Sequence, residues 1–190
     1  MKKLTKLFIA ILLLVALGIS GYHVFPLVQR EIDRWRHPIH YEEYVMAAAR
    51  QHDIEPARIF AVILAESGFR YDAVSRAEAK GLMQFMPATF EWLVRLRGLD
   101  YDADDVFTPS VNIDFGAFYL RFLYNQLGDW DHVHMAYNAG LSNVQAWLGR
   151  PELLENGRIV HELIPFGETR RYIQRVNNAI SEYRRLYFDE

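Results

Sequence analysis

One carboxylate stands on the apolar side of a predicted helix. In the segment PARIFAVILAESGF, which spans residues 56–69, Glu66 follows Ile59 by seven residues and Ile63 by three. Helical spacing therefore places the glutamate on the face that turns toward a core. Burial, together with the negative end of the helix dipole, should raise the pKa of this carboxyl group. A glutamate that stays protonated near neutral pH could donate a proton to a glycosidic oxygen.

A simple ion pair is the other interpretation of this helix. Glu66 could pair with Arg58 or Arg70 at a frayed helix end and have no chemical role. Periodicity does not separate the two interpretations. The segment that follows favours the first.

The residues after Glu66 form a dense pattern at fixed spacings. The run ESGFRYDAVSRAEAKGLMQFMPATF spans residues 66–90. Its fixed positions are Glu66, Ser67, Ala73, Ser75, Ala79, Gly81, Leu82, Met83, Gln84, Met86, Pro87 and Thr89. This pattern resembles the signature of the family-1 lytic transglycosylases, whose catalytic domain is related to goose-type lysozyme.

Three later blocks resemble the remaining motifs of that family in the same order. They are Pro109-x-x-Asn112 leading to Gly116 and Tyr119-Leu120, then AYNAG over residues 136–140, and IPFGETRRY over residues 164–172. The resemblance covers about residues 41–187. Two departures are visible, Thr108 where aspartate is common and Leu141 where proline often stands. Neither touches a position that the resemblance assigns to chemistry.

The resemblance implies a set of site residues. Glu66 matches the single catalytic acid and base, and Ser75 and Gln84 match residues that line the cleft near the scissile bond. The other matched positions are Met86 as a sugar contact, Tyr137 beside the catalytic glutamate, and Glu168 as a cleft carboxylate. Asn138, which follows Tyr137, suits a turn that borders the groove and is a further candidate for substrate binding. Two alternatives stay open: Glu168 could simply stabilise a helix N-terminus, and Tyr137 could be a core residue.

The implied reaction cleaves the β-1,4 bond between N-acetylmuramic acid and N-acetylglucosamine in peptidoglycan, and leaves 1,6-anhydromuramoyl ends. It needs no cofactor and no metal. His132 and His134 are two residues apart, so on a helix they point to different faces and do not form a metal site. The alternatives are a hydrolytic muramidase on the same fold, and a non-catalytic peptidoglycan-binding scaffold with protein partners in an envelope-spanning complex.

Helix signals and the absence of strand alternation favour an all-α fold, a single lysozyme-like helical domain with a cleft. Prolines mark helix starts and glycines mark helix ends. The predicted helices are Tyr41–His52, Pro56–Ser67, Pro87–Arg97, Pro109–Leu127, Asp131–Ala139, Leu141–Leu148 and Glu168–Tyr187.

The N-terminal segment predicts a membrane anchor. Residues 7–19 carry no charge, and the apolar character continues to Val28, which gives about 20 residues, enough to cross a bilayer core. Lysines before this run and acidic residues after it favour a cytoplasmic N-terminus and a periplasmic domain. We therefore expect a single-pass helix in the inner membrane over residues 1–28, a juxtamembrane linker over 29–39 and the catalytic domain over 40–190. A cleaved signal peptide, followed by secretion, is the alternative.

Composition narrows the remaining classes. The 190 residues suffice for one domain, and aromatic residues make up 14%, which suits a packed helical domain. The chain has no cysteine, so it has neither disulfide bonds nor thiolate metal sites. Its net charge is −3, and most of its few lysines precede the apolar run. The acidic balance of the rest argues against nucleic acid as a partner.

Overall fold

The computed structural model describes residue 20 and residues 22–189, and the chain falls into two compact units, Met1–Pro38 and Ile39–Glu190. In the first unit, residues 22–36 are helical and carry exposed apolar side chains, among them Phe25, Leu27 and Trp35. The transmembrane helix predicted over residues 1–28 lies mostly outside the described residues. Within the described part, no helix is both long and apolar enough to cross a membrane.

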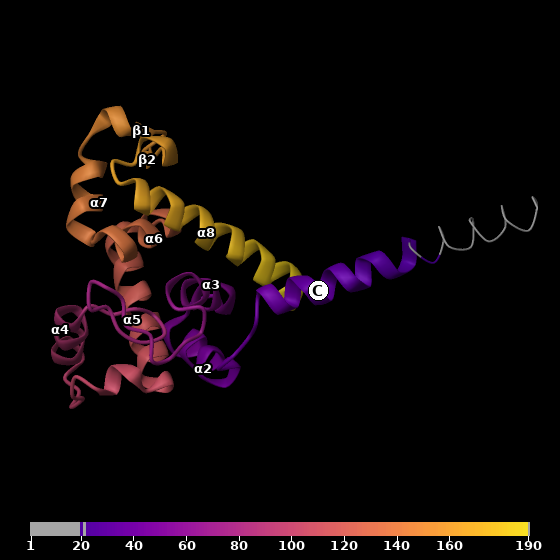
Figure 1. Cartoon of the computed structure of the whole chain (residues 1–190). Helices are drawn as coiled ribbons and strands as arrows, with labels where there is room; N and C mark the ends of the chain where they lie inside the picture. Colours follow the sequence, from indigo (N-terminus) through magenta and orange to yellow (C-terminus); the bar gives the residue numbers. More distant parts are fainter. Residues whose placement is uncertain (1–19, 21, 190) are drawn as a thin grey trace, which may run out of the picture. The chain divides into compact units, whose positions relative to one another are not determined.

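Helices dominate the second unit (Figure 1). The α-helices are α2 (Glu42–His52), α3 (Pro56–Glu66), α4 (Pro87–Arg97), α5 (Pro109–Leu127), α6 (Trp130–Ala139), α7 (Leu141–Leu148) and α8 (Gly167–Tyr183). Shorter turns are η1 (Asp105–Phe107), η2 (Pro151–Leu153) and η3 (His161–Leu163), and a π-helical turn, η4 (Arg184–Phe188), follows α8. Proline is the first residue of α3, α4 and α5, where its missing N–H leaves no helical hydrogen bond unmade.

The structure confirms the predicted bounds of α4, α5 and α7 and corrects the others by a few residues. Helix α6 begins at Trp130 because the Asp129 carboxylate caps it and accepts hydrogen bonds from the backbone N–H groups of Asp131 and His132. Helix α8 ends at Tyr183. A short antiparallel hairpin, β1 (Leu154–Glu155) paired with β2 (Arg158–Ile159), was not predicted. Two-residue strands are too short to show an alternating pattern.

Helix α3 is the centre of the second unit. Its residues 59–63 are fully buried, and it packs against α8, α2 and α5. The stacked rings of Phe60 and Tyr183, 5.3 Å apart, join it to α8. Near the start of α3, Arg184 donates to Glu55 at 2.6 Å. The last residue of α3 interacts with Tyr172. The two helices are therefore antiparallel, and the end of α3 meets the first half of α8.

Candidate active site

Glu66 is the last residue of α3 and is partly buried. Burial raises the pKa of its carboxyl group from 4.5 to about 7. This is the direction expected from its place on the apolar face. The alternative ion pairs are not formed among the described residues, since Arg58 pairs with Glu55 and Arg70 donates to the Ser67 carbonyl. A carboxyl group with this pKa can both give and accept a proton near neutral pH.

Three side chains of α8 act on the Glu66 carboxyl group. Tyr172 through its hydroxyl group and Arg175 by its charge stabilise the carboxylate and lower the pKa of Glu66, whereas the charge of Glu168 raises that pKa. These effects are smaller than that of burial. The Tyr172 hydroxyl is buried and interacts with the Glu66 carboxyl group, but it makes no hydrogen bond of good geometry in the described chain. Glu168 itself is exposed.

Helix α6 brings Tyr137 to the same place. The Tyr137 hydroxyl donates to the Met83 carbonyl at 2.8 Å, and the Glu66 charge is one of the causes, after burial, that raise the pKa of this tyrosine. The neighbouring Asn138 accepts a hydrogen bond from the Thr169 hydroxyl at 2.8 Å. Asn138 therefore ties the end of α6 to the start of α8. Helices α6 and α8 thus bring Tyr137, Tyr172 and Glu168 close to Glu66 at the end of α3.

Ser75 and Gln84 shape the loop between α3 and α4. The Ser75 hydroxyl accepts hydrogen bonds from the backbone N–H groups of Ala77 and Ala79, at 3.2 and 3.0 Å. The Gln84 side-chain amide donates to the carbonyls of Ala73 and Gly81, at 3.2 and 2.9 Å. Within the described chain, the hydrogen bonds of both side chains therefore stay in the loop, and neither bonds to Glu66.

Met86 ends the same loop and is 45% exposed, an unusual position for a large apolar side chain. It directly precedes α4. Its exposure leaves the thioether accessible to a ligand.

Asn112, which is fully buried on α5, anchors the loop between α3 and α4. Its side chain accepts from the Met83 N–H at 2.8 Å and donates to the Val106 carbonyl at 2.7 Å. Gly116, one helical turn further on, leaves space for Met83. A Cβ atom at position 116 would lie 1.9 Å from the Met83 sulfur. Both residues therefore place Met83, whose carbonyl holds Tyr137.

Sequence reasoning did not assign roles to Tyr172, Arg175 or Asn112. Tyr172 and Asn112 stand inside the blocks that carry the resemblance, and this was the signal available for them. Arg175 stands beyond the last block. Its proximity to Glu66 depends on how α8 packs against α3, which lies about a hundred residues earlier in the chain.

The two histidines of α6 belong to the interior. His132 accepts a hydrogen bond from the Ile159 backbone N–H at 3.1 Å. Burial lowers the pKa of His134 to about 4, so it is neutral at physiological pH. Among the residues that the structure describes, no group of three or more potential metal ligands comes together.

Known proteins are similar to this chain over most of its length. The Transglycosylase SLT domain family matches residues 43–157. The soluble lytic murein transglycosylase of Salmonella typhimurium is 33% identical over 152 residues, which cover 78% of this chain and 24% of that protein. Membrane-bound lytic murein transglycosylase C of Yersinia pestis is 32% identical over 193 residues, which cover 87% of this chain and 53% of that protein. The chain thus spans only about a quarter of the first relative and about half of the second.

Solved structures of lytic transglycosylases have the same fold. An inactive mutant of the lytic transglycosylase Slt from Pseudomonas aeruginosa superposes with a TM-score of 0.75 at 32% identity, over 83% of this chain and 26% of that one. The 70 kDa soluble lytic transglycosylase of Escherichia coli gives a TM-score of 0.73 at 30% identity, over 80% of this chain and 25% of that one. Sequence and fold agree, and the chain belongs to the Transglycosylase SLT domain family.

Proposed function

We propose that this protein is a murein lytic transglycosylase that cleaves the β-1,4 bond between N-acetylmuramic acid and N-acetylglucosamine, with Glu66 as its catalytic acid and base. The observation that carries the proposal is the partly buried Glu66 carboxyl group, whose pKa is raised to about 7, in a chain that matches the SLT domain family. Its named relatives are lytic murein transglycosylases.

In the first step, protonated Glu66 donates its proton to the glycosidic oxygen while the bond to the muramoyl anomeric carbon breaks. N-acetylglucosamine leaves as an alcohol, and the electron pair of the broken bond stays on its oxygen. The N-acetyl group of the substrate stabilises the resulting cation. Tyr172 and Arg175 favour the carboxylate form of Glu66, so they support this loss of the proton.

In the second step, the Glu66 carboxylate removes the proton from the 6-hydroxyl group of the same muramoyl residue. The 6-oxygen then bonds to the anomeric carbon and closes the 1,6-anhydro ring. Glu66 regains its proton, and no water is consumed. A pKa near the working pH suits one residue that acts first as acid and then as base.

The remaining site residues support substrate binding in this proposal. Met86 offers an exposed apolar contact to a sugar face, and Ser75 and Gln84 hold the loop that borders the cleft. Tyr137 and Asn138 line the groove from α6. Glu168 is a second carboxylate near Glu66, and its charge helps to keep Glu66 protonated.

Digestion of purified murein by the wild-type protein and by the Glu66→Gln variant tests the proposal. Glu162→Gln is the matched control, because Glu162 is an exposed glutamate to which we assign no role. We expect Glu66→Gln to abolish cleavage, the control to retain it, and mass spectrometry to find anhydromuramoyl ends. Unchanged turnover in Glu66→Gln would refute catalysis by this residue. Reducing ends, heavier by one water molecule, would indicate a hydrolytic muramidase instead.

The proposal extends to where the reaction takes place. Residues 1–28 anchor the chain in the inner membrane, residues 29–39 form a linker, and residues 40–190 face peptidoglycan strands in the periplasm. The uncharged run at 7–19 and the exposed apolar side chains of residues 22–35 support a membrane location. One relative is named as membrane-bound. A tethered enzyme of this kind would suit protein partners in an envelope-spanning complex.

A further inference from the structure

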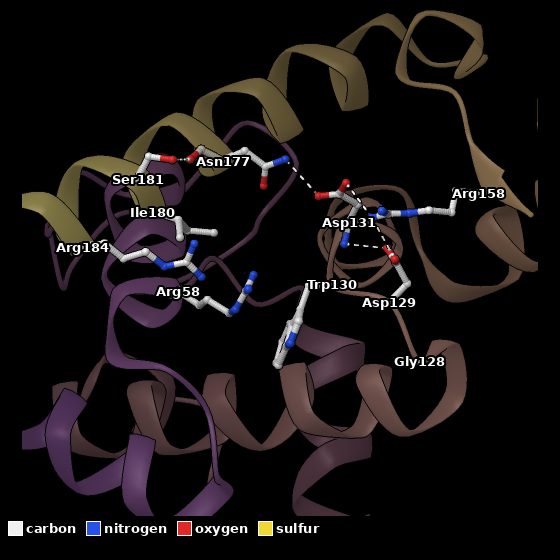
Figure 2. A pocket seen from close by; sticks show the side chains of 10 residues that line it. All are labelled: Arg58, Gly128, Asp129, Trp130, Asp131, Arg158, Asn177, Ile180, Ser181 and Arg184. Atoms are coloured by element: carbon white, nitrogen blue, oxygen red, sulfur yellow. Dashed lines mark hydrogen bonds and ion pairs between the residues drawn. The ribbon is translucent and has the colours of Figure 1, made fainter. Parts of the chain in front are cut away.

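A polar pocket of about 400 Å³ opens at the other end of α3 from Glu66 (Figure 2). Arg58 of α3, Trp130 at the start of α6, Ser181 of α8 and Arg184 of η4 contribute to its lining. Arg58 precedes Glu66 by eight residues, which is about 12 Å along the helix axis. The pocket is therefore separate from the proposed catalytic residues.

Arg58 is a cation with unused donors. Its side chain is only 15% exposed, and its guanidinium carbon lies 4.5 Å from the centre of the Trp130 ring. Its Nε atom approaches Glu55 at 3.3 Å. In the described part of the chain, the two terminal amino groups of Arg58 have no hydrogen-bond acceptor. Glu55 is also engaged by both Nε and Nη2 of Arg184, so two cations share one carboxylate.

The acidic residues of the pocket are already satisfied. Asp131 accepts from Asn177 at 3.0 Å and from Arg158 at 3.2 Å, while Asp129 pairs with Arg158 at 2.9 Å. Figure 2 shows these carboxylates on one side of the pocket, with Arg58 and Arg184 on the other. The terminal N–H groups of Arg58 therefore remain open to solvent and to a ligand that carries negative charge.

We propose that this pocket binds the carboxylate of a peptide, with Arg58 as the principal ligand. A planar guanidinium group matches a carboxylate in a two-hydrogen-bond fork, and stacking on Trp130 leaves its N–H edge free for this. The acidic wall would repel the second charge of a phosphate, which favours a monoanion. The volume of about 400 Å³ exceeds that of a carboxylate alone, so the pocket also accepts the residues that carry it.

The peptides of peptidoglycan are a source of such carboxylates, and this part of the inference rests on the proposed function. A peptide bound behind the active site would hold the enzyme on a neighbouring strand of the wall. Binding of a simple peptide acid does not depend on that function. The carboxylate site and the identity of the wall peptide as its ligand can therefore be refuted separately.

Calorimetric titration of the full-length protein tests the carboxylate site. N-acetyl-D-alanyl-D-alanine is the probe, and its C-terminal amide and inorganic phosphate are the comparisons. We expect the acid to bind at least tenfold more tightly than either comparison. Equal binding of acid and amide, no binding of the acid, or tighter binding of phosphate would each overturn the proposal.

Two variants locate the binding. Arg58→Lys keeps the charge but loses the fork, and we expect it to weaken binding of the acid about tenfold. Ser181→Asp places a negative charge on an exposed position of the pocket and should abolish binding, whereas Ser142→Asp, on the exposed surface of α7, should not change it. Wild-type affinity in Ser181→Asp would overturn the proposal even if Arg58→Lys failed to fold.

A disaccharide-tetrapeptide from murein tests the source of the carboxylate. It is titrated into Glu66→Gln, to exclude turnover, and into Glu66→Gln combined with Ser181→Asp. Weaker binding to the double variant is expected. Equal binding to both would show that the wall peptide does not use the pocket, whatever the result for murein cleavage by the wild type.

Discussion

The chemistry proposed for Glu66 follows from where its carboxyl group is held. A glutamate in water is ionised at neutral pH and cannot protonate a glycosidic oxygen efficiently. Burial at the end of α3 opposes ionisation, while Tyr172 and Arg175 limit how far the pKa rises. The balance leaves this pKa at about 7, so near neutral pH the group can both donate and accept a proton.

The pH profile of murein cleavage should report this pKa. We expect kcat/KM to fall above pH 7, by about tenfold per pH unit, because the first step needs protonated Glu66. Tyr172→Phe removes an effect that lowers the pKa of Glu66, so the fall should move to higher pH. Glu168→Gln removes an effect that raises it, so the fall should move to lower pH. Shifts in the opposite directions would contradict the assigned interactions.

The same carboxyl group should make folding stability depend on pH. An unfolded glutamate loses its proton near pH 4.5, whereas Glu66 in the folded state keeps it to about pH 7. Between these values the folded state binds more protons, so the contribution of Glu66 to stability is present at low pH and is lost as pH rises through 7. The loss is at most about 3 kcal/mol.

Glu66→Gln cannot ionise and should escape this loss. We expect the variant to unfold at a higher temperature than the wild type at pH 8, and the difference to vanish near pH 4.5. Calorimetric melting curves at several pH values measure it. A difference that does not change with pH would mean that Glu66 is solvated and has an ordinary acidity.

At the scale of elements, the sequence predicts where the helices lie along the chain better than it predicts which helices pack together. Proline and glycine act through local backbone geometry, so α4 and α5 begin at a proline and end before a glycine, as those residues indicate. The hairpin turn at Asn156-Gly157 also carries a local signal, but its strands are too short for a periodic pattern. Contacts such as Tyr172 with Glu66 depend on long-range packing of α8, which periodicity does not encode.

The loop between α3 and α4 depends on one buried amide of α5. We expect Asn112→Ala to lower the free energy of unfolding by about 2–4 kcal/mol, since it leaves the Met83 N–H and the Val106 carbonyl unpaired in the interior. Urea denaturation measures the change. Asn143→Ala is the control, because its bond to the Ala139 carbonyl is exposed, and it should cost less than about 1 kcal/mol. Similar losses in both variants would contradict this role of Asn112.

At the scale of the whole molecule, the proposed function assigns membrane location to the first unit and chemistry to the second. All residues proposed for catalysis and for the peptide pocket lie within Ile39–Glu190, which has its own core. The raised pKa of Glu66, its helix and the family were predictable because they depend on residues close together in sequence. The pocket at Arg58 was not, because α3, α6, the hairpin and α8 contribute to it from four separate segments.

Replacing residues 1–28 by a cleavable signal peptide should separate the two units in function. We expect the wild-type protein to sediment with the inner membrane and to resist extraction by high salt, since an apolar helix is held by burial in lipid. The replaced form should be soluble in the periplasm. It should cleave isolated murein at a rate within about twofold of the wild type, because its active-site pKa values arise within the second unit. N-terminal sequencing is the control for processing: a wild-type protein that begins near Gly21 and is soluble would show that the segment is a cleaved signal peptide.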